Sequence, residues 1–202
     1  VSRKIIEKNR RIGVSMSGIQ DWVLKAFDGR LVVGWDGDKP VYNEAAIKRV
    51  NELYEAVQRA DEMYSEKLGC CLSVKTTTIK PSGTVSKLAG VSEGVHYHYA
   101  KFLIQRIRFQ DSDPLMPFLK AAGFRIEDDV YSANTKVVEF FVKAASADEE
   151  GFISAGEVSI EEQFAVQAFL QTYWADNSVS CTITFNDKEH DKIAPLFVQY
   201  KD

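Results

Sequence analysis

The chain has 202 residues, of which 45% are hydrophobic and 27% are charged. These proportions are typical of a globular sequence that is long enough to bury a core of its own. The formal net charge is −4, which argues against a general nucleic-acid-binding surface, because such domains usually carry an excess of basic residues. A small phosphorylated ligand is compatible with this charge, since it needs only local positive potential.

Three cysteines are present, namely Cys70, Cys71 and Cys181. Their odd number and the adjacency of two of them argue against a disulfide framework and favour a reducing, cytoplasmic setting. No apolar run approaches the roughly 20 residues that a membrane-spanning helix needs, and no signal peptide is recognisable. The chain begins without Met and ends without an obvious stop, so we expect it to be part of a longer protein.

Strand-like and helix-like stretches alternate along the chain, a pattern typical of βα units and a parallel sheet. In the first part, strands are expected at 11–16 and 31–35, with a helix between them at about 19–27. A turn-rich stretch at 36–40 closes the second strand.

The clearest helix lies between Asn43, which can cap its start, and Gly69, which can end it. Its apolar residues recur at helical spacing, so we expect one buried face. The β-branched stretch at 74–79 predicts a strand directly after it. Further strands are predicted at 102–109 and 135–142.

Capping signals predict later helices. One starts at 111–114, with Pro114 at a favoured first-turn position. Ser159, with Glu162 three residues later, forms a capping box for another helix. That helix is apolar nearly all round, so we expect it to be buried on more than one side. Residues 180–185 predict a last strand, which a terminal helix follows.

The junction at 80–85, Lys-Pro-Ser-Gly-Thr-Val, has the features of an anion-binding turn. Pro81 disfavours helix at the preceding residue, so the strand must end there. Ser82 can cap the new helix, and Gly83 lets the backbone come close to a ligand. The first helical amides lack intrahelical acceptors and carry the positive end of the helix dipole. The turn also lies at the carboxyl end of a strand, where parallel sheets bind ligands.

Taken alone, this turn is equally compatible with a well-capped junction that binds nothing, since the spacing of a P-loop is absent. His96 and His98 would face the same side of an extended segment, but a metal site needs further ligands, and loop packing is favoured for both. Arg106 and Arg108 could meet a phosphate or a carboxylate, although a solvent-facing salt-bridge network is the commoner outcome. Cys181, in a predicted strand, is interpreted as an inert small hydrophobe.

Four blocks of the sequence become recognisable together, at 9–15, 80–90, 103–114 and 167–185. In this order they resemble the C-terminal part of the catalytic barrel of class II ribonucleotide reductases. Within that family the resemblance is greatest to the monomeric branch that acts on ribonucleoside triphosphates, and it runs over essentially the whole chain.

The resemblance implies an α/β fold that forms about half of a ten-stranded α/β barrel with parallel strands and flanking helices. Residues 1–202 would be the C-terminal portion of that barrel. It also implies reduction of ribonucleoside triphosphates to deoxyribonucleotides through a thiyl radical, with adenosylcobalamin as cofactor and an external dithiol such as thioredoxin as reductant. By analogy, the residues that would hold the substrate phosphates are Pro81, Ser82, Gly83, Thr84, Val85 and Ser86.

The chain departs from the family in its cysteines. The Asn-Pro-Cys-Gly-Glu-type loop that carries the thiyl cysteine and the reducing cysteine pair are both absent. Cys70, Cys71 and Cys181 match neither motif, so no catalytic residue and no metal ligand is assigned to this segment. We expect the segment alone to be inactive and the missing N-terminal part of the same chain to be its partner, with no nucleic acid and no membrane involved.

Two alternatives stay open. One is a non-catalytic α/β module that contributes only structure or a partner surface. The other is a phosphate-binding barrel enzyme of different chemistry, including a cobalamin-independent radical reductase.

Overall fold

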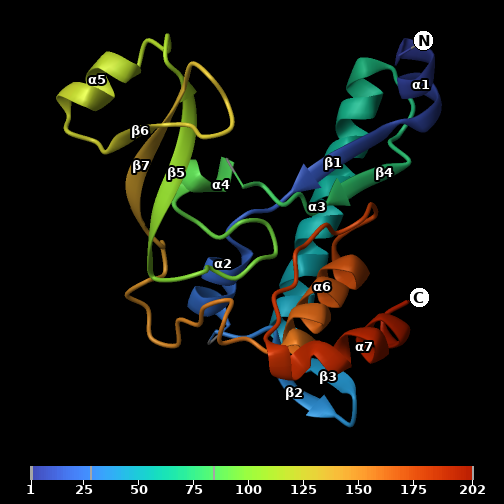
Figure 1. Cartoon of the computed structure of the whole chain (residues 1–202). Helices are drawn as coiled ribbons and strands as arrows, with labels where there is room; N and C mark the ends of the chain where they lie inside the picture. Colours follow the sequence, from blue (N-terminus) through green and yellow to red (C-terminus); the bar gives the residue numbers. More distant parts are fainter. Residues whose placement is uncertain (1, 28, 84, 202) are drawn as a thin grey trace.

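The computed structural model describes residues 2–27, 29–83 and 85–201 of the chain. A pair of parallel strands lies beside a long helix, and an antiparallel arm extends from this body (Figure 1). The predicted α/β class is therefore confirmed. A helix, α1 (Ser2–Asn9), precedes the first strand.

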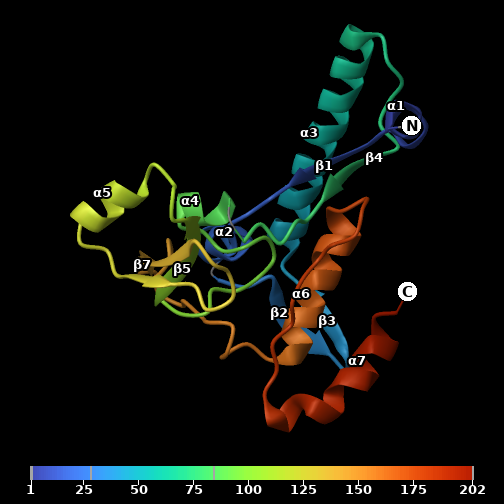
Figure 2. The same ribbon diagram turned by 45° about the horizontal axis from the view of Figure 1, so that its top comes forward.

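The parallel pair consists of β1 (Arg11–Ser15) and β4 (Lys75–Thr78), with Ser15 beside Thr78 at their carboxyl ends. Both strands run alongside the long helix α3 (Glu44–Leu68) (Figures 1 and 2). Directly after β4, Ile79 forms a parallel bridge with Val179, which brings the segment after α6 beside this strand. Because β1 and β4 are parallel, the segments that follow them leave from the same edge of the sheet.

The predicted caps of α3 are confirmed. The Asn43 side chain accepts hydrogen bonds from the backbone amides of Ala45 and Ala46. At the other end, Gly69 adopts a left-handed conformation with φ 63°, which lets the Cys70 amide turn back to a carbonyl of the last turn. These local interactions fix both ends of the longest helix.

The main hydrophobic core lies between α2 (Ile19–Ala26), α3 and α6 (Ile160–Tyr173). α6 is buried on several sides, as its apolar sequence predicts, and Phe169 and Leu170 are completely inaccessible to solvent. The residues that follow α6 bind both strands: the Thr76 amide of β4 donates to the Asp176 carboxylate, and the Asn177 side chain donates to the Ile12 carbonyl of β1. The buried position of α6 therefore helps to hold β1 and β4 in place.

Only half of the predicted capping box at the start of α6 is present. Ser159 Oγ accepts a hydrogen bond from the Glu162 amide at 3.2 Å. The Glu162 carboxylate does not return this bond, because it accepts from the Tyr97 hydroxyl and pairs with Arg30. A tertiary contact therefore takes the place of a local one.

A hairpin of β2 (Val32–Asp36) and β3 (Lys39–Tyr42) turns around Gly37 within the predicted turn-rich stretch. The Tyr42 hydroxyl donates a hydrogen bond to the Ala165 carbonyl at 2.9 Å. This bond attaches the hairpin to α6.

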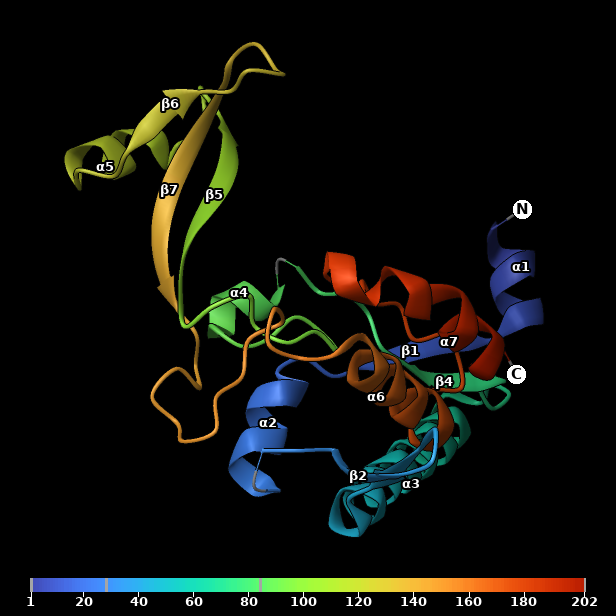
Figure 3. The same ribbon diagram turned by 60° about the horizontal axis from the view of Figure 1, so that its bottom comes forward.

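The antiparallel arm contains the two longest strands, β5 (Phe102–Gln110) and β7 (Thr135–Lys143). They pair over their full length, and β6 (Ile126–Asp128) adds to the far side of β7. The arm, with helix α5 (Met116–Ala121), projects away from the body (Figure 3). The predicted start of this helix at 111–114 is too early, because α5 begins at Met116 with Leu115 as its N-cap, and Pro117 rather than Pro114 lies in its first turn. The Asp113 carboxylate accepts a hydrogen bond from the Leu115 amide just before the helix.

The expectation of parallel strands is wrong for two of the three sheets that the described residues form. β1 and β4 are parallel, whereas the hairpin and the arm are antiparallel. In the arm, the Asp111 amide donates to the Asn134 carbonyl, so β7 starts beside the end of β5 and must run backwards. Alternating strand and helix signals locate elements, but the connection decides their direction.

The predicted strand at 180–185 is also wrong, since these residues form no ladder in the described structure. Two of its amides donate to side chains instead: the Thr182 amide to His96 and the Thr184 amide to Gln163. The predicted terminal helix is confirmed as the short helix η1 (Asp187–Lys192) and α7 (Ile193–Gln199).

Candidate functional site

The predicted anion-binding turn lies at the common carboxyl edge of β1 and β4. It leads into α4 (Val85–Ala89), a helix of only five residues. Two serines from the end of β1 reach the turn: Ser15 Oγ accepts a hydrogen bond from the Lys80 amide at 2.8 Å, and Ser17 Oγ lies 2.6 Å from Ser82 Oγ. The parallel pairing of the strands thus brings two distant segments together.

Ser82 is the most constrained residue of the turn. Its φ of 40° lies in the left-handed region, which is uncommon for a residue with a Cβ. Its side chain is buried and accepts a hydrogen bond from the Gly94 amide at 3.1 Å. Its carbonyl accepts from both the amide and the hydroxyl of Ser86. Contacts on every side therefore hold this backbone in place.

The loop that follows α4 packs directly against the turn. Gly94 has φ 53°, and a Cβ at this position would lie only 2.4 Å from the Lys80 carbonyl oxygen. Glu93 approaches from the same loop, with a carboxylate oxygen 3.5 Å from where a Cβ of Gly83 would lie. Lys87 Nζ pairs with that carboxylate at 2.5 Å and offsets its negative charge beside the turn.

The structure brings together five of the six predicted site residues. Ser82 and Ser86 are buried with their hydroxyls engaged inside the turn, whereas Pro81, Gly83 and Val85 are exposed. Thr84 lies outside the described residues. In the described part of the chain, no acceptor pairs with the Gly83 or Val85 amide. These two backbone donors are the groups that can meet an anion, so phosphate binding here stays a prediction.

His96 and His98 have separate partners. His96 Nε2 accepts a hydrogen bond from the Thr182 amide at 2.8 Å, so Nδ1 carries the proton and donates to the Glu93 carbonyl. His98 instead contacts Asp21. Among the residues that the structure describes, no group of three or more His, Cys, Asp and Glu side chains could hold a metal ion.

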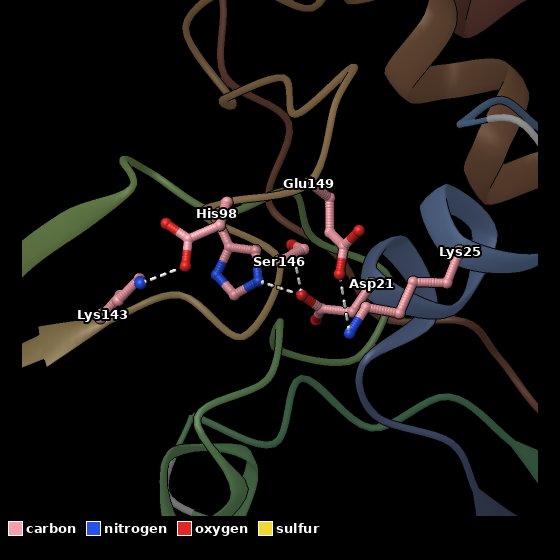
Figure 4. A network of polar contacts seen from close by, with 7 residues as sticks. Asp21, Lys25, His98, Lys143, Ser146 and Glu149 are labelled. Atoms are coloured by element: carbon pink, nitrogen blue, oxygen red, sulfur yellow. Dashed lines mark hydrogen bonds and ion pairs between the residues drawn. The ribbon is translucent and has the colours of Figure 1, made fainter.

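A buried polar network that the sequence did not reveal is centred on Asp21 of α2 (Figure 4). Its carboxylate accepts hydrogen bonds from His98 Nε2 (2.8 Å), Ser146 Oγ (2.5 Å) and the Ser92 amide (2.8 Å). Burial raises the pKa of Asp21, but these hydrogen bonds outweigh it and hold the pKa well below its usual range. The network ties α2 to the loop that supports the turn.

The structure gives no sign of a catalytic or ligand-binding role for the described cysteines or for Arg106 and Arg108. Cys70 and Cys71 are exposed, and burial raises the pKa of the Cys181 thiol, which disfavours a reactive thiolate. Arg106 contacts Glu127 and Glu139, and Arg108 pairs with Asp129 at 3.1 Å. The salt-bridge network expected as the commoner outcome for these arginines is therefore confirmed.

No helix in the described ranges combines the length and the hydropathy needed to cross a membrane.

No protein-family profile matches the chain, but curated relatives match it throughout. The adenosylcobalamin-dependent ribonucleoside-triphosphate reductase of Levilactobacillus brevis is 63% identical over 100% of the chain and 28% of its own length. The protein of the same name from Lactobacillus leichmannii is 60% identical over 100% of the chain and 29% of its own length.

A crystal structure of a B12-dependent (class II) ribonucleotide reductase superimposes with a TM-score of 0.87 and 60% identity, over 98% of this chain and 29% of that chain. Fold and sequence therefore define a segment of a ribonucleotide reductase of class II. The chain belongs to the family of adenosylcobalamin-dependent ribonucleoside-triphosphate reductases, and it spans less than a third of the length of these relatives. The resemblance carried by the four sequence blocks is confirmed.

Proposed function

We propose that this chain is the substrate-phosphate-binding segment of an adenosylcobalamin-dependent reductase that converts ribonucleoside triphosphates to deoxyribonucleotides by a thiyl-radical mechanism. The observation that carries the proposal is the identity of 60% or more, over the whole chain, with reductases of that name. The thiyl cysteine and the reducing cysteine pair would come from parts of the polypeptide outside these 202 residues. An external dithiol such as thioredoxin would reduce that pair.

The second part of the proposal is that β1 and β4 are neighbouring strands of a ten-stranded α/β barrel, with residues 1–202 as its C-terminal portion. Parallel sheets are normally covered on both faces, and a two-stranded sheet is marginal by itself. Ile12, Val14 and Val74 are nevertheless exposed around this pair. Further strands from the longer polypeptide would cover them. The chain would then supply fewer than half of the barrel strands, because β5, β6 and β7 form the separate antiparallel arm.

The turn at 81–86 would bind phosphate oxygens through the Gly83 and Val85 amides, with Thr84 between them. Such donors need a fixed backbone, because they then bind an anion without first being ordered. The contacts of Ser82 with Ser17, Ser86 and Gly94 supply this rigidity. In this role the turn positions the ribose and takes no part in bond breaking.

Adenosylcobalamin would supply the radical chemistry of the full-length protein. The residues described here do not by themselves fit that cofactor. The apolar cavity between α6 and α7, lined by Phe164, Ile183 and Phe197 among others, has a volume of about 390 Å³. A corrinoid with its adenosyl group would need an enclosure that other parts of the full-length polypeptide complete, so no step of the reaction is derived through the cofactor from this segment.

The test uses the full-length reductase with Gly83→Val and, as a matched control, Gly156→Val. Neither glycine needs a positive φ, and Gly156 has no neighbour within 4 Å of an added Cβ. Gly83→Val would crowd the anion position, so we expect KM for the ribonucleoside triphosphate to rise by about tenfold or more. Adenosylcobalamin affinity should stay unchanged.

An unchanged KM in Gly83→Val would remove the turn from the substrate site. Formation of deoxyribonucleotides by the wild-type protein without added adenosylcobalamin would support a cobalamin-independent reductase instead.

A further inference from the structure

Ser17 lies next to the turn but belongs to a different segment, the residues that follow β1. Its Oγ is 2.6 Å from Ser82 Oγ, and Ser17 itself is exposed. The next residue, Gly18, donates its amide to the Ser92 carbonyl at 2.8 Å, which holds this segment against the loop that supports the turn. Ser17 therefore stands at a fixed place at the rim of the turn.

The direction of the bond between the two hydroxyls follows from the burial of Ser82. Ser82 is 6% exposed, and its oxygen accepts from the Gly94 amide. Its own hydrogen needs an acceptor, because buried hydroxyl donors are rarely left unpaired. Within the described residues Ser17 Oγ is the one acceptor in reach. Ser82 thus donates to Ser17, and the hydrogen of Ser17 remains available on an exposed side chain.

The result is a short chain of donors that runs outward, from the Gly94 amide through the Ser82 hydroxyl to the Ser17 hydroxyl. Each bond in such a chain polarises the next one, so the terminal hydroxyl becomes a stronger donor. It ends at the same edge of the sheet as the exposed residues Gly83 and Val85. Ser82 directly precedes Gly83 in the chain, so the Ser17 hydroxyl, which contacts Ser82 Oγ, lies beside the residue whose amide would hold an oxyanion.

We propose that the Ser17 hydroxyl is a further hydrogen-bond donor to the substrate phosphates, oriented by the buried hydroxyl of Ser82. This inference rests on the proposed function of the turn as a phosphate site. It adds a binding residue from the end of β1 to a site otherwise made of one continuous segment.

The experiment compares Ser17→Ala and Ser17→Thr with the matched control Ser112→Ala in the full-length reductase. Ser112 is an exposed serine in the arm. The measurements are kcat and KM for the ribonucleoside triphosphate, the affinity for the unphosphorylated nucleoside, and Tm.

A hydrogen bond to a charged oxygen corresponds to about a tenfold change in affinity or more. We therefore expect Ser17→Ala to raise KM for the triphosphate by about that factor, with a smaller change in kcat and with unchanged nucleoside affinity. Ser17→Thr retains the hydroxyl and should restore KM, and Ser112→Ala should match the wild type.

Three results would overturn the inference. A raised KM in Gly83→Val with a normal KM in Ser17→Ala would refute the role of Ser17 and leave the phosphate site standing. If Ser17→Ala instead weakens triphosphate and nucleoside binding equally and lowers Tm, Ser17 only supports the structure. A normal KM in both variants would refute the phosphate site itself.

Discussion

Replacing Asp21 with Asn tests whether the buried network controls the loop that supports the candidate phosphate turn. The Asn side chain has nearly the same shape, but it has one acceptor oxygen and a donor amide in place of two acceptor oxygens. Oδ1 can still accept from His98 and Ser146, as it does in Asp21. The amide group would then face the Ser92 N–H, so that two donors meet.

The magnitude follows from the lost bond. A hydrogen bond to a charged group contributes about 1.5–3 kcal/mol, and the opposed donors add to the loss. We expect the free energy of opening of the loop to fall by about 3 kcal/mol, which is on the order of a 100-fold increase in amide exchange. Asp38→Asn, at an exposed position, removes the same charge and serves as the control.

The assay is native-state hydrogen exchange of the peptide that contains residues 91–99 in the full-length protein. Exchange should accelerate in Asp21→Asn and stay at the wild-type rate in Asp38→Asn. If both variants exchange alike, the network does not hold the loop, and the argument from the three hydrogen bonds is refuted.

The same network predicts acid sensitivity. The pKa of Asp21 in the folded protein is below that of an unfolded Asp, about 3.9. Its contribution is therefore fully present above pH about 4 and is lost as the pH falls through the folded-state pKa. After correction for intrinsic exchange, loop opening should be constant from neutral pH down to about pH 5 and rise below about pH 4. Asp21→Asn should lack this rise.

Two further predictions concern the neighbours of the turn. Lys87→Met should raise KM for the triphosphate by roughly three- to tenfold, because the Glu93 carboxylate then faces the phosphates without its cationic partner. Adding Glu93→Gln should reverse the effect, and an unchanged KM in Lys87→Met would contradict this prediction. Gly94→Ala should lower Tm by several degrees more than Gly37→Ala, since both glycines have positive φ but only Gly94 would place its Cβ against the Lys80 carbonyl. Equal shifts in Tm would show that the close packing of this loop on the turn contributes nothing.

The buried network and the turn are connected through the loop at 91–99. Asp21 fixes the Ser92 amide, and the adjoining Gly94 amide fixes Ser82. A change in α2 can therefore alter the turn without touching it. The two histidines of the loop at 91–99 each anchor it to a different element, His98 to α2 and His96 to the segment at 182.

The sequence determined the elements whose causes are local. Asn43 and Gly69 fixed the ends of α3, and the β-branched residues before Pro81 predicted β4. The apolar residues on nearly all sides of α6 predicted its burial. Four sequence blocks were enough to predict the family. In each case the signal and its effect lie within a few residues of each other or within a recognisable string.

Only the tertiary structure decided which distant residues meet. Ser17 and Ser82 are 65 positions apart, and Asp21 is 125 positions from Ser146. The antiparallel direction of the arm appears only in the pairing of β5 with β7. The predicted strand at 180–185 failed because the Thr182 and Thr184 amides donate to side chains and not to a neighbouring strand. Hydrogen-bond partners and strand direction depend on which distant segments pack together, and the local spacing of residues does not contain that information.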